Sequence, residues 1–574
     1  MAVTKYSLFS DSKTFTELPL RLSPEDVLNK FNILFPTDEQ ISKDTLKQFV
    51  EENFYSADSL ESGRSVELNV CTPVDWKPIP PSFLQIQDKS SREFALDIHK
   101  KWTDLCRSVT KNVEDNPNRF SLIYLKHPFI VPGGRFREMY YWDSYWTIKG
   151  LLVSEMYESV RFMLLNMADL IKKFGLIPNG GRIYYLQRSQ PPLFGFMIKE
   201  YFDKTKDVEL VKELLPFLEK EFEFWDKNRS RILKIDDDSY RVYQCNADSD
   251  FPRPESHKED VNLTKNVTEV DQKHKIWHEL ASAAESGWDF STRWLRNNDD
   301  LSTLETTSIL PVDLNAFICG SKMVLMNLYK EVGGNGDRII ELEKEIRAMK
   351  KMMDKVFLDF ETGTYLDYNI RKGCHNREFY PIAFAPFFCE LFDDEAHDEI
   401  LNNTFRRMKE MGAWDYVGGI PASLTTSQEQ WDFPNVWPPL VHMVVEALRK
   451  SSDSTLKKAG YDLATKFVAY SYEVFKEYGY MFEKYEATGR RKVGSGGEYK
   501  VQQGFGWTNG VVLDIIMTYK DEIELAPRFI EEPEENTEPW YLHPLHAIHF
   551  AEHKPIFSST SPAFSMFFSL LRML

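Results

Sequence analysis

Apolar residues recur at intervals of three and four along three long stretches of the chain, 207–227, 338–357 and 456–478. This spacing places the apolar side chains on one face of a helix, so each stretch is predicted to be an amphipathic helix. Strict alternation of apolar and polar residues is scarce, and 239–243 is the one short strand that we predict. The pattern therefore predicts a chain that is mainly α-helical.

A polar, glycine-rich segment at 332–337 lies between two helical patterns. Its glycine and asparagine residues are typical of a helix end followed by a helix start, and the connection is short. An antiparallel helix pair is therefore predicted around this turn.

Six loops rich in aromatic, glycine and polar residues each run into a helical pattern. They are 132–145, 179–192, 252–260, 286–294, 419–439 and 494–510. Two of the helices expected to follow are 145–153 and 440–449, and the second begins behind Pro438 and Pro439, because proline is favoured in the first helical turn. Helix pairs arranged in a ring would bring these loops to one end, where loops on a rigid scaffold carry functional groups.

We therefore predict an all-α fold, an (α/α)6 barrel, with small irregular and β elements in its loops. Residues 86–574 are predicted to form one barrel that carries the site, and residues 1–85 an N-terminal extension that wraps it. No linker rich in Pro, Gly and Ser separates a second domain.

The charge of the chain narrows the choice of partner. Its 574 residues include 88 acidic and 70 basic side chains, which gives a formal net charge of −18. Nucleic acids and anionic membranes bind clustered Lys and Arg, so both are disfavoured, whereas a neutral small molecule is compatible with this charge. The aromatic fraction of 14%, with 13 Trp, suits a sugar-binding cleft but also an ordinary core.

Weak signals bear on the compartment. The first residues lack the apolar segment of a secretion signal, and no run approaches the ~18 apolar residues that span a membrane. We expect a cytoplasmic protein, with a secreted or membrane-anchored form left open, and a monomer or homodimer. Four Asn-x-Ser/Thr sequons are a number expected by chance.

The six cysteines are scattered without zinc-site spacing, and they are expected to be reduced thiols in the core, with one or two bridges left open. The stripe His543, His546, His549 and His553 is interpreted as structural or surface rather than metal-binding. The apolar tail near Phe564–Leu571 is expected to dock on the core.

Two segments, 132–145 and 430–439, combine Arg, Asp and Gln with Trp, Phe and Tyr over a few residues. A sugar is bound by flat apolar faces and by forked hydrogen bonds to neighbouring hydroxyls, and these side chains supply both. The chemistry of the two segments therefore predicts a sugar site.

Both segments match the signature motifs of the trehalase family position by position, and shorter matches occur at 177–180, 188–192, 253–256, 285–291, 483–485 and 497–510. Over roughly residues 10–550 the chain resembles animal-type trehalases. The resemblance implies an (α/α)6 barrel that hydrolyses α,α-trehalose to two glucoses with inversion and without cofactor or metal. Glu486 departs from the Asp or Asn more usual after Glu-Lys-Tyr, and the calcium-binding extension of fungal neutral trehalases has no counterpart.

The resemblance assigns the general acid to Asp289 and the general base to Glu483. The substrate-binding residues that it and the motif chemistry indicate are Arg135, Phe136, Tyr140, Trp142, Asp143, Asn179, Arg188, Gln190, Arg253, Glu255, Gly287, Trp431, Asp432, Glu498, Phe505 and Trp507. Glu138 and Asp143 also have a structural interpretation, as a salt-bridge shell for Arg135.

Inverting hydrolysis requires a protonated carboxyl at the glycosidic oxygen and a carboxylate that activates water on the opposite ring face, about 6.5–9.5 Å apart. Trp288 gives Asp289 an apolar flank, which is expected to raise its pKa. Arg135, Arg188 and Arg253 are expected to neutralise other carboxylates and keep Glu483 ionised.

Two alternative functions remain. The chain could cleave another α-glucoside, or could bind trehalose as a catalytically silent sensor, although a binder has no need of an acid–base pair. The glycine run at 494–497 resembles a phosphate loop but lacks the following Lys-Ser/Thr, so we interpret it as a lid that closes over the sugar.

Overall fold

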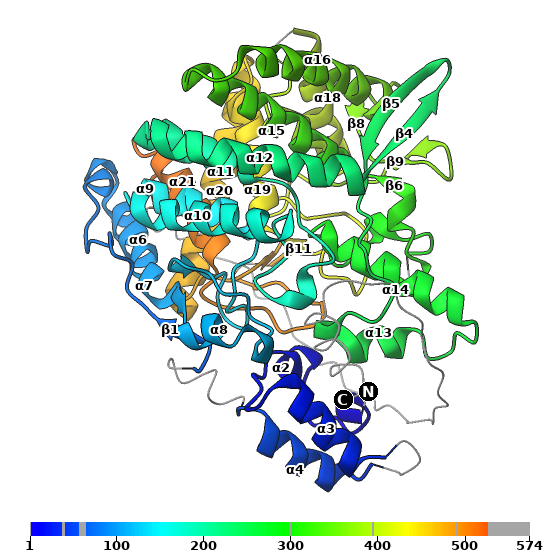
Figure 1. Ribbon diagram of the computed structural model, residues 1–574. Coiled ribbons are helices and arrows are strands. Elements are labelled where there is room, and N and C mark those ends of the chain that lie inside the picture. Colours follow the sequence, from blue (N-terminus) through cyan, green and yellow to red (C-terminus); the bar gives the residue numbers. More distant parts are fainter. Residues whose placement is uncertain are drawn as a thin grey trace, which may run out of the picture.

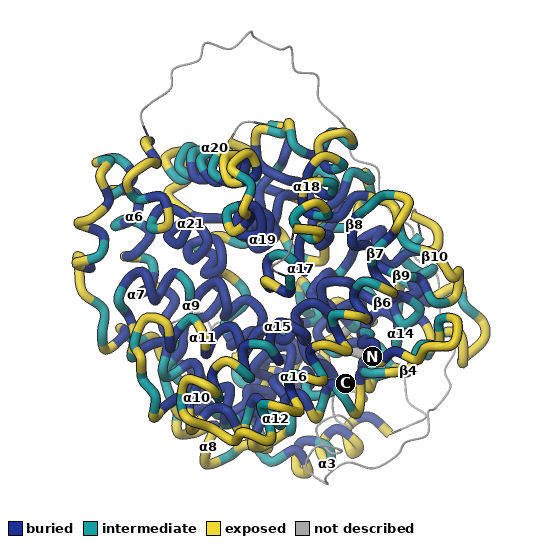
Figure 2. Tube along the Cα trace, turned by 90° about the horizontal axis from the view of Figure 1, so that it is seen from above, coloured by how far each residue is buried: buried dark blue, intermediate teal, exposed yellow. Residues whose placement is uncertain are grey.

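Six helices form a closed inner ring in the computed structural model, which describes residues 2–36, 41–56, 65–298, 300–392, 395–489 and 491–525. They are α9 (Asp143–Val153), α11 (Phe194–Thr205), α15 (Val312–Glu331), α17 (Ala385–Phe388), α19 (Pro438–Arg449) and α21 (Gly506–Thr518). Each packs against the next, and α21 packs against α9 to close the ring. Figure 2 shows these buried helices around a common centre.

A second set of helices covers the ring from outside. It consists of α6 (Lys89–Lys100), α10 (Tyr157–Phe174), α12 (Val208–Asn228), α16 (Gly336–Met352), α18 (Glu395–Glu410) and α20 (Ser454–Tyr478). In α12, for example, Leu214, Leu218 and Phe222 face inward and are buried, whereas Glu209 and Glu223 are exposed. Two concentric layers of six helices make an (α/α)6 barrel, which confirms the predicted fold class.

The predicted helices are confirmed, and most of their ends lie within one or two residues of the predicted positions. The pattern over 338–357 is the exception, because α16 ends at Met352 and 353–357 continue as a π-helical turn. The turn at 332–337 joins α15 and α16, which pack against each other as predicted. Pro438 and Pro439 open α19, and α9 begins at Asp143, two residues before the expected start.

Short elements fill the connections. The helices are α1 (Ala2–Lys5), α2 (Ser12–Thr16), α3 (Pro24–Leu34), α4 (Lys43–Asn53), α7 (Trp102–Leu105), α8 (Lys111–Asp115), α13 (His257–Leu263) and α14 (Val270–Glu285). The 3-10 turns include η1 (Pro81–Gln85), η2 (Pro117–Arg119), η3 (Ile183–Tyr185), η4 (Pro254–Ser256), η5 (Thr292–Trp294), η6 (Leu301–Thr303), η7 (Thr306–Ser308) and η9 (Pro381–Phe384).

The strands are short and antiparallel. They are β1 (Leu68–Val70), β2 (Cys106–Val109), β3 (Phe129–Ile130), β4 (Ser230–Ile235), β5 (Asp238–Tyr243), β6 (Ile309–Leu310), β7 (Leu358–Asp359), β8 (Thr364–Tyr365), β9 (Tyr368–Asn369), β10 (Cys374–His375), β11 (Asn435–Val436) and β12 (Tyr485–Glu486). The predicted strand 239–243 is β5, paired with β4 in a hairpin that projects from the barrel (Figure 1).

Residues near the N-terminus have a small core of their own. Val27, Phe31, Leu46 and Phe49 from α3 and α4 form an apolar cluster separate from that of the barrel. Figure 1 shows α2, α3 and α4 beneath the end of the barrel that carries the long loops. The division at residue 85 stays a prediction.

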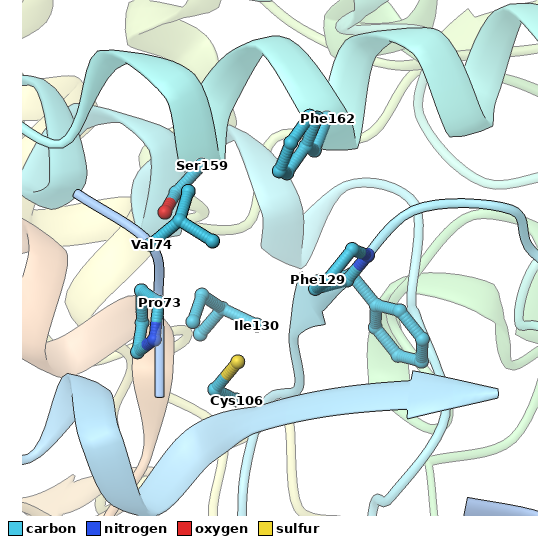
Figure 3. A pocket seen from close by; sticks show the side chains of 8 residues that line it. Pro73, Val74, Cys106, Phe129, Ile130, Ser159 and Phe162 are labelled. Carbon is cyan, nitrogen blue, oxygen red and sulfur yellow. The ribbon is translucent and has the colours of Figure 1, made fainter. Parts of the chain in front are cut away.

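Cys71 and Cys106 form a disulfide where β1 meets β2, so one of the bridges that the sequence left open is present and these two cysteines are not reduced thiols. The register of β1 and β2 brings the two residues opposite each other. Cys245, Cys319 and Cys389 are buried thiols, as expected, and Cys374 is exposed. Beside the disulfide lies a hollow of about 260 Å3, open to solvent, lined by Pro73, Val74, Cys106, Pro128, Phe129, Ile130, Ser159 and Phe162 (Figure 3).

Within the described ranges, no helix is both long and apolar enough to cross a membrane. The histidine stripe and the apolar tail lie outside the described residues.

Glycines set the closest helix contact of the ring. A Cβ atom on Gly510 of α21 would lie 1.8 Å from the backbone oxygen of Trp146 in α9, and one on Gly150 would lie 2.6 Å from the Cα of Gly510. Since no side chain fits there, the two backbones meet directly.

Gly510→Ala is therefore expected to destabilise the protein by about 2 kcal/mol or more, because the added methyl must push α9 and α21 apart. Thermal unfolding would show this as a lower Tm. Gly336→Ala is the matched control, since a Cβ there meets nothing within 4 Å and alanine favours the start of α16. An equal Tm for both variants would contradict the steric argument.

Candidate active site

The candidate residues gather where loops enter the inner helices. Asp143 opens α9, Gln190 precedes α11, Trp431 precedes α19, and Trp507 lies in the first turn of α21. The loops 132–145, 179–192, 419–439 and 494–510 thus lead into inner-ring helices as predicted. The loop 252–260 leads into α13 instead, and 286–294 is separated from α15 by two 3-10 turns, η6 and η7, and the strand β6.

Three carboxyl groups, those of Asp143, Asp289 and Glu483, lie close enough to interact electrostatically, and we call the region that they share the chamber. The charges of Glu483 and Asp289 both raise the pKa of Asp143, and both also act on Lys484. Protein atoms surround the three groups, yet Asp289 and Glu483 keep partial solvent access. The structure therefore brings together the two predicted catalytic residues, which are 194 positions apart in the chain.

Burial dominates the ionisation of this group of carboxyls. It raises the pKa of Asp289 to about 7, against the opposing charge of Arg253, while Glu498 adds to the rise. It also raises the pKa of Asp143 to about 8. Burial raises the pKa of Glu483 too, but the adjacent Lys484 ammonium and a backbone hydrogen bond favour its ionised form. The predicted rise for Asp289 is confirmed, and the cation beside Glu483 is Lys484 rather than one of the three arginines.

A tight turn after α14 presents Asp289 to the chamber. Gly287 has φ of +79°, and a Cβ on it would lie 2.8 Å from the indole of Trp142, so glycine allows this close approach. The carbonyl of Asp289 accepts a 2.5 Å hydrogen bond from Nε2 of Gln430, whose own oxygen accepts one from Lys484. The backbone that carries the acid is thereby tied to the residue next to Glu483.

Glu483 is held by its backbone on two sides. Its N–H donates to the carbonyl of Gln502 at 3.0 Å, and its carbonyl accepts from Nε1 of Trp507 at 2.8 Å. The next residue along, Lys484, lies over the ring of Trp437 at 4.8 Å. Apart from the backbone hydrogen bond with Gln502, the carboxyl of Glu483 has no hydrogen-bond partner among the described residues, which leaves it available to a ligand or water.

Indole and phenyl rings line the chamber. Trp142 lies edge-on to Trp507 at 6.1 Å and tilted against Trp431 at 5.8 Å. Phe505 contacts Trp507 at 4.9 Å and Phe136 at 6.1 Å. Aromatic faces in this arrangement can stack on the C–H faces of a pyranose.

Three arginines in the wall each pair with a carboxylate, and the partner of Arg135 is Asp11 at 2.6 Å. Arg188 pairs with Glu255, and its Nε donates to Asn179 at 3.2 Å. Arg253 bridges Asp260 and Glu498, both at 2.7 Å. As predicted, these arginines neutralise carboxylates other than the catalytic pair, and they stand as fixed forks for hydroxyl groups.

Several buried polar atoms of this wall have no hydrogen-bond partner among the described residues. They include Nε of Arg135 and Oε2 of Glu255. Because burying an unpaired polar group is costly, such atoms mark positions that a bound molecule can satisfy. Gln190 contributes differently, since its oxygen accepts from the backbone N–H of Trp142 at 3.1 Å.

Two residues that were predicted to bind the substrate are occupied by contacts within the protein. Asp432 is fully buried and accepts five hydrogen bonds, from Ser291, Ser423, Ser427 and the N–H and hydroxyl of Thr292. Trp431 is stacked between Trp288 at 5.0 Å and Trp437 at 3.8 Å. Both residues tie the loop 419–439 to the loop of Asp289.

The salt-bridge shell considered for Arg135 is wrong. Glu138 pairs instead with Lys13 and Arg182, Asp143 forms no ion pair within the described chain, and Arg135 is bridged by Asp11 at 2.6 Å. Lys13 and Asp11 lie outside the motifs, and the sequence alone gives them no role. Lys484 and Gln430 lie within the motifs without a predicted role, although a lysine directly after a candidate base was a usable signal.

The site places the protein in a class. A carboxyl whose pKa burial raises to about 7 and a second carboxyl beside a lysine, among arginines and aromatic rings at the loop end of an (α/α)6 barrel, are typical of a glycoside hydrolase. The family model described as Trehalase matches residues 7–520. The chain belongs to the trehalase family.

Relatives and a solved structure agree with this membership. Human trehalase is 39% identical over 90% of this chain and 87% of its own length. Trehalase of Apis mellifera is 38% identical over 93% of this chain and 85% of its own. The structure of neutral trehalase from Saccharomyces cerevisiae covers 69% of this chain and 74% of its own, with a TM-score of 0.56 at 22% identity, which shows a common fold.

Proposed function

We propose that the protein hydrolyses α,α-trehalose to two glucoses with inversion at one anomeric carbon. Asp289, whose pKa burial raises to about 7, donates its proton to the glycosidic oxygen as the C1–O bond breaks. Glu483 takes a proton from the water whose oxygen forms the new bond to C1. The observation that carries the proposal is the chamber in which these carboxyls from separate loops interact with Asp143.

Asp143 is proposed to bind the substrate as a neutral carboxyl group. With its pKa raised to about 8, it is protonated at neutral pH and can donate a hydrogen bond to a sugar hydroxyl. Its neutral form also avoids a third negative charge beside Asp289 and Glu483. A neutral substrate suits this wall, because its arginines are already paired with carboxylates of the protein.

The contacts of the loop 494–510 support its proposed role as a lid over the sugar. Glu498 accepts from Arg253 at 2.7 Å and from Ser256, and the hydroxyl of Tyr499 donates to the carbonyl of Glu255 at 3.2 Å. These contacts hold the loop against the opposite wall in the closed position. A lid that excludes water strengthens the electrostatic interactions inside the chamber.

The anomers released from trehalose test the mechanism. NMR spectra during the first minutes of hydrolysis are expected to show equal initial amounts of α- and β-glucose, because one ring is inverted and the other is only released. Two α products would indicate retention and overturn the acid–base assignment. Maltose is the control substrate, and its hydrolysis at a comparable rate would indicate a broader α-glucosidase.

The disulfide bears on the compartment. Disulfides persist in oxidising compartments and are rare in the cytosol. We therefore propose an oxidising compartment in place of the cytoplasm expected from the sequence. The asparagines of all four sequons are exposed, as attachment of a glycan requires; they are Asn228, Asn262, Asn266 and Asn402. Thiol alkylation of the protein isolated from its source, with and without reductant, would count two additional reactive thiols only after reduction.

A further inference from the structure

A segment far from the motifs in sequence, residues 11–17, forms part of the chamber wall. It contains α2, which packs against η4, the turn that carries Glu255. Ser12 ties the segment to the start of α13, because its hydroxyl accepts from the N–H of Lys258 at 2.9 Å. Figure 1 shows α2 lying against the loop end of the barrel.

Lys13 extends from this segment into the protein and is 1% exposed. Its ammonium contacts Oε1 of Glu138 at 2.5 Å, Oε1 of Glu17 at 2.7 Å and the hydroxyl of Tyr140 at 3.2 Å. Burial opposes its charge, but the carboxylates of Glu138 and Glu17 raise its pKa well above the usual value. Lys13 is therefore a permanently charged group directly behind Tyr140, one of the predicted sugar-binding residues.

A chain of contacts leads from Lys13 to the arginine fork. The hydroxyl of Tyr140 also hydrogen-bonds Glu138 at 2.7 Å and the hydroxyl of Tyr185 at 2.9 Å. The guanidinium of Arg188 lies over the ring of Tyr185 at 5.0 Å. Removing the cation would leave Glu138 with Arg182, at 3.4 Å, as its one remaining ion-pair partner in the described chain.

Asp11 acts on a second arginine. One carboxylate oxygen contacts Nη2 of Arg135 at 2.6 Å and also caps the N-terminus of α2. Tyr499 of the loop 494–510 lies against the other side, 5.0 Å from the guanidinium. This clamp leaves Nε of Arg135 buried and without a partner in the described residues, which is a donor available to a sugar hydroxyl.

We propose that Lys13 and Asp11 are positioning residues of the sugar-binding wall: Lys13 orients Tyr140 and, through Tyr185, Arg188, and Asp11 orients Arg135. The inference rests on the proposed sugar-binding function of the chamber. Neither residue faces the reacting carboxyls, so their loss acts on binding rather than on proton transfer. A purely structural role, in which the charges only fasten the N-terminal helices, would change stability alone.

The test compares Asp11→Asn and Lys13→Met with the wild-type chain by steady-state kinetics on trehalose. We expect KM to rise about 10-fold for each variant and kcat to change less than about threefold, because a charge-assisted contact that orients a binding group is lost. Lys13→Arg is expected to recover part of the loss, since it restores the charge. Asp11 is partly exposed, at 20% for its side chain, so Asp11→Asn is expected to fold.

Two controls remove comparable interactions away from the chamber. Lys322→Met deletes a buried lysine, 4% exposed, that pairs with Glu345 at 2.8 Å between α15 and α16. Asp88→Ala deletes the cap of α6, where the carboxylate accepts from the backbone N–H of Ser91 at 2.7 Å. Both are expected to lower Tm without changing KM.

Glucose binding, measured by tryptophan fluorescence, distinguishes a failure of the proposed function from a failure of the positioning role. If the wild-type chain fails to release glucose from trehalose, the proposed function is wrong, and the positioning role is judged from glucose binding alone, with Kd expected about 10-fold weaker in Asp11→Asn. Unchanged KM and Kd in Asp11→Asn, or KM effects equal to those of the two controls, would overturn the positioning role.

Discussion

Replacing Asp289 with Asn is expected to lower kcat on trehalose by about 10³-fold or more, because the amide cannot protonate the leaving glucose. Binding should persist, since Asn has nearly the same shape and the carbonyl of Asp289 keeps its bond from Gln430. Glu483→Gln should cause a loss of similar size by removing the base that activates water. Steady-state kinetics measures both losses, and Asp97→Asn is the control, since this half-exposed aspartate pairs with Lys100 on the surface of α6.

The two roles are separable by the leaving group. Glucosyl fluoride releases fluoride, which needs little protonation, so Asp289→Asn should retain much more of its activity on this substrate than on trehalose. Glu483→Gln should lose activity on both, because water still has to be deprotonated. The opposite pattern would mean that Glu483 is the acid and Asp289 the base. Equal losses in both variants on both substrates would contradict the assignment of separate acid and base roles.

The sequence was sufficient to predict the barrel because its helices follow a local pattern. Leu214, Leu218 and Phe222 place α12 without knowledge of its neighbours, and Pro438 marks the start of α19. The β4–β5 hairpin was only half predicted, because most side chains of β4 face solvent and carry no alternation. The π-helical turn after Met352 depends on packing rather than on local propensity.

The candidate site could be predicted where residues lie in contiguous motifs, and not where contacts join distant segments. Asp289 and Glu483 stood in recognisable contexts. The clamp between Asp11 and Arg135 joins residues 124 positions apart, and the bond from Gln430 to Asp289 spans 141. Neither pairing has a periodicity or a spacing that a single sequence reveals. The same holds for Asp432, which has the composition of a ligand but is occupied by five internal hydrogen bonds.

The proton on Asp289 also makes the stability of the protein depend on pH. An unfolded aspartate titrates near 3.8, whereas burial raises the pKa of Asp289 in the folded chain to about 7. Between these values only the folded state holds the proton, so the free energy of unfolding falls as pH rises through this window and levels off above about 7. Each unit of difference corresponds to about 1.4 kcal/mol, and partial solvent access reduces the effect.

Asp289→Asn is therefore expected to be more stable than the wild-type chain by about 2 kcal/mol at pH 8 and by less than half of that at pH 5, because the amide needs no proton to remain neutral and most of the pH window lies above 5. Thermal unfolding at the two pH values measures the difference, and Asp97→Asn should show none. The same ionisation should give wild-type kcat/KM an alkaline limb near pH 7, falling tenfold for each further unit as the acid is lost. A variant whose stability advantage is independent of pH would mean that Asp289 is already ionised in the folded protein, and it could not then serve as the acid.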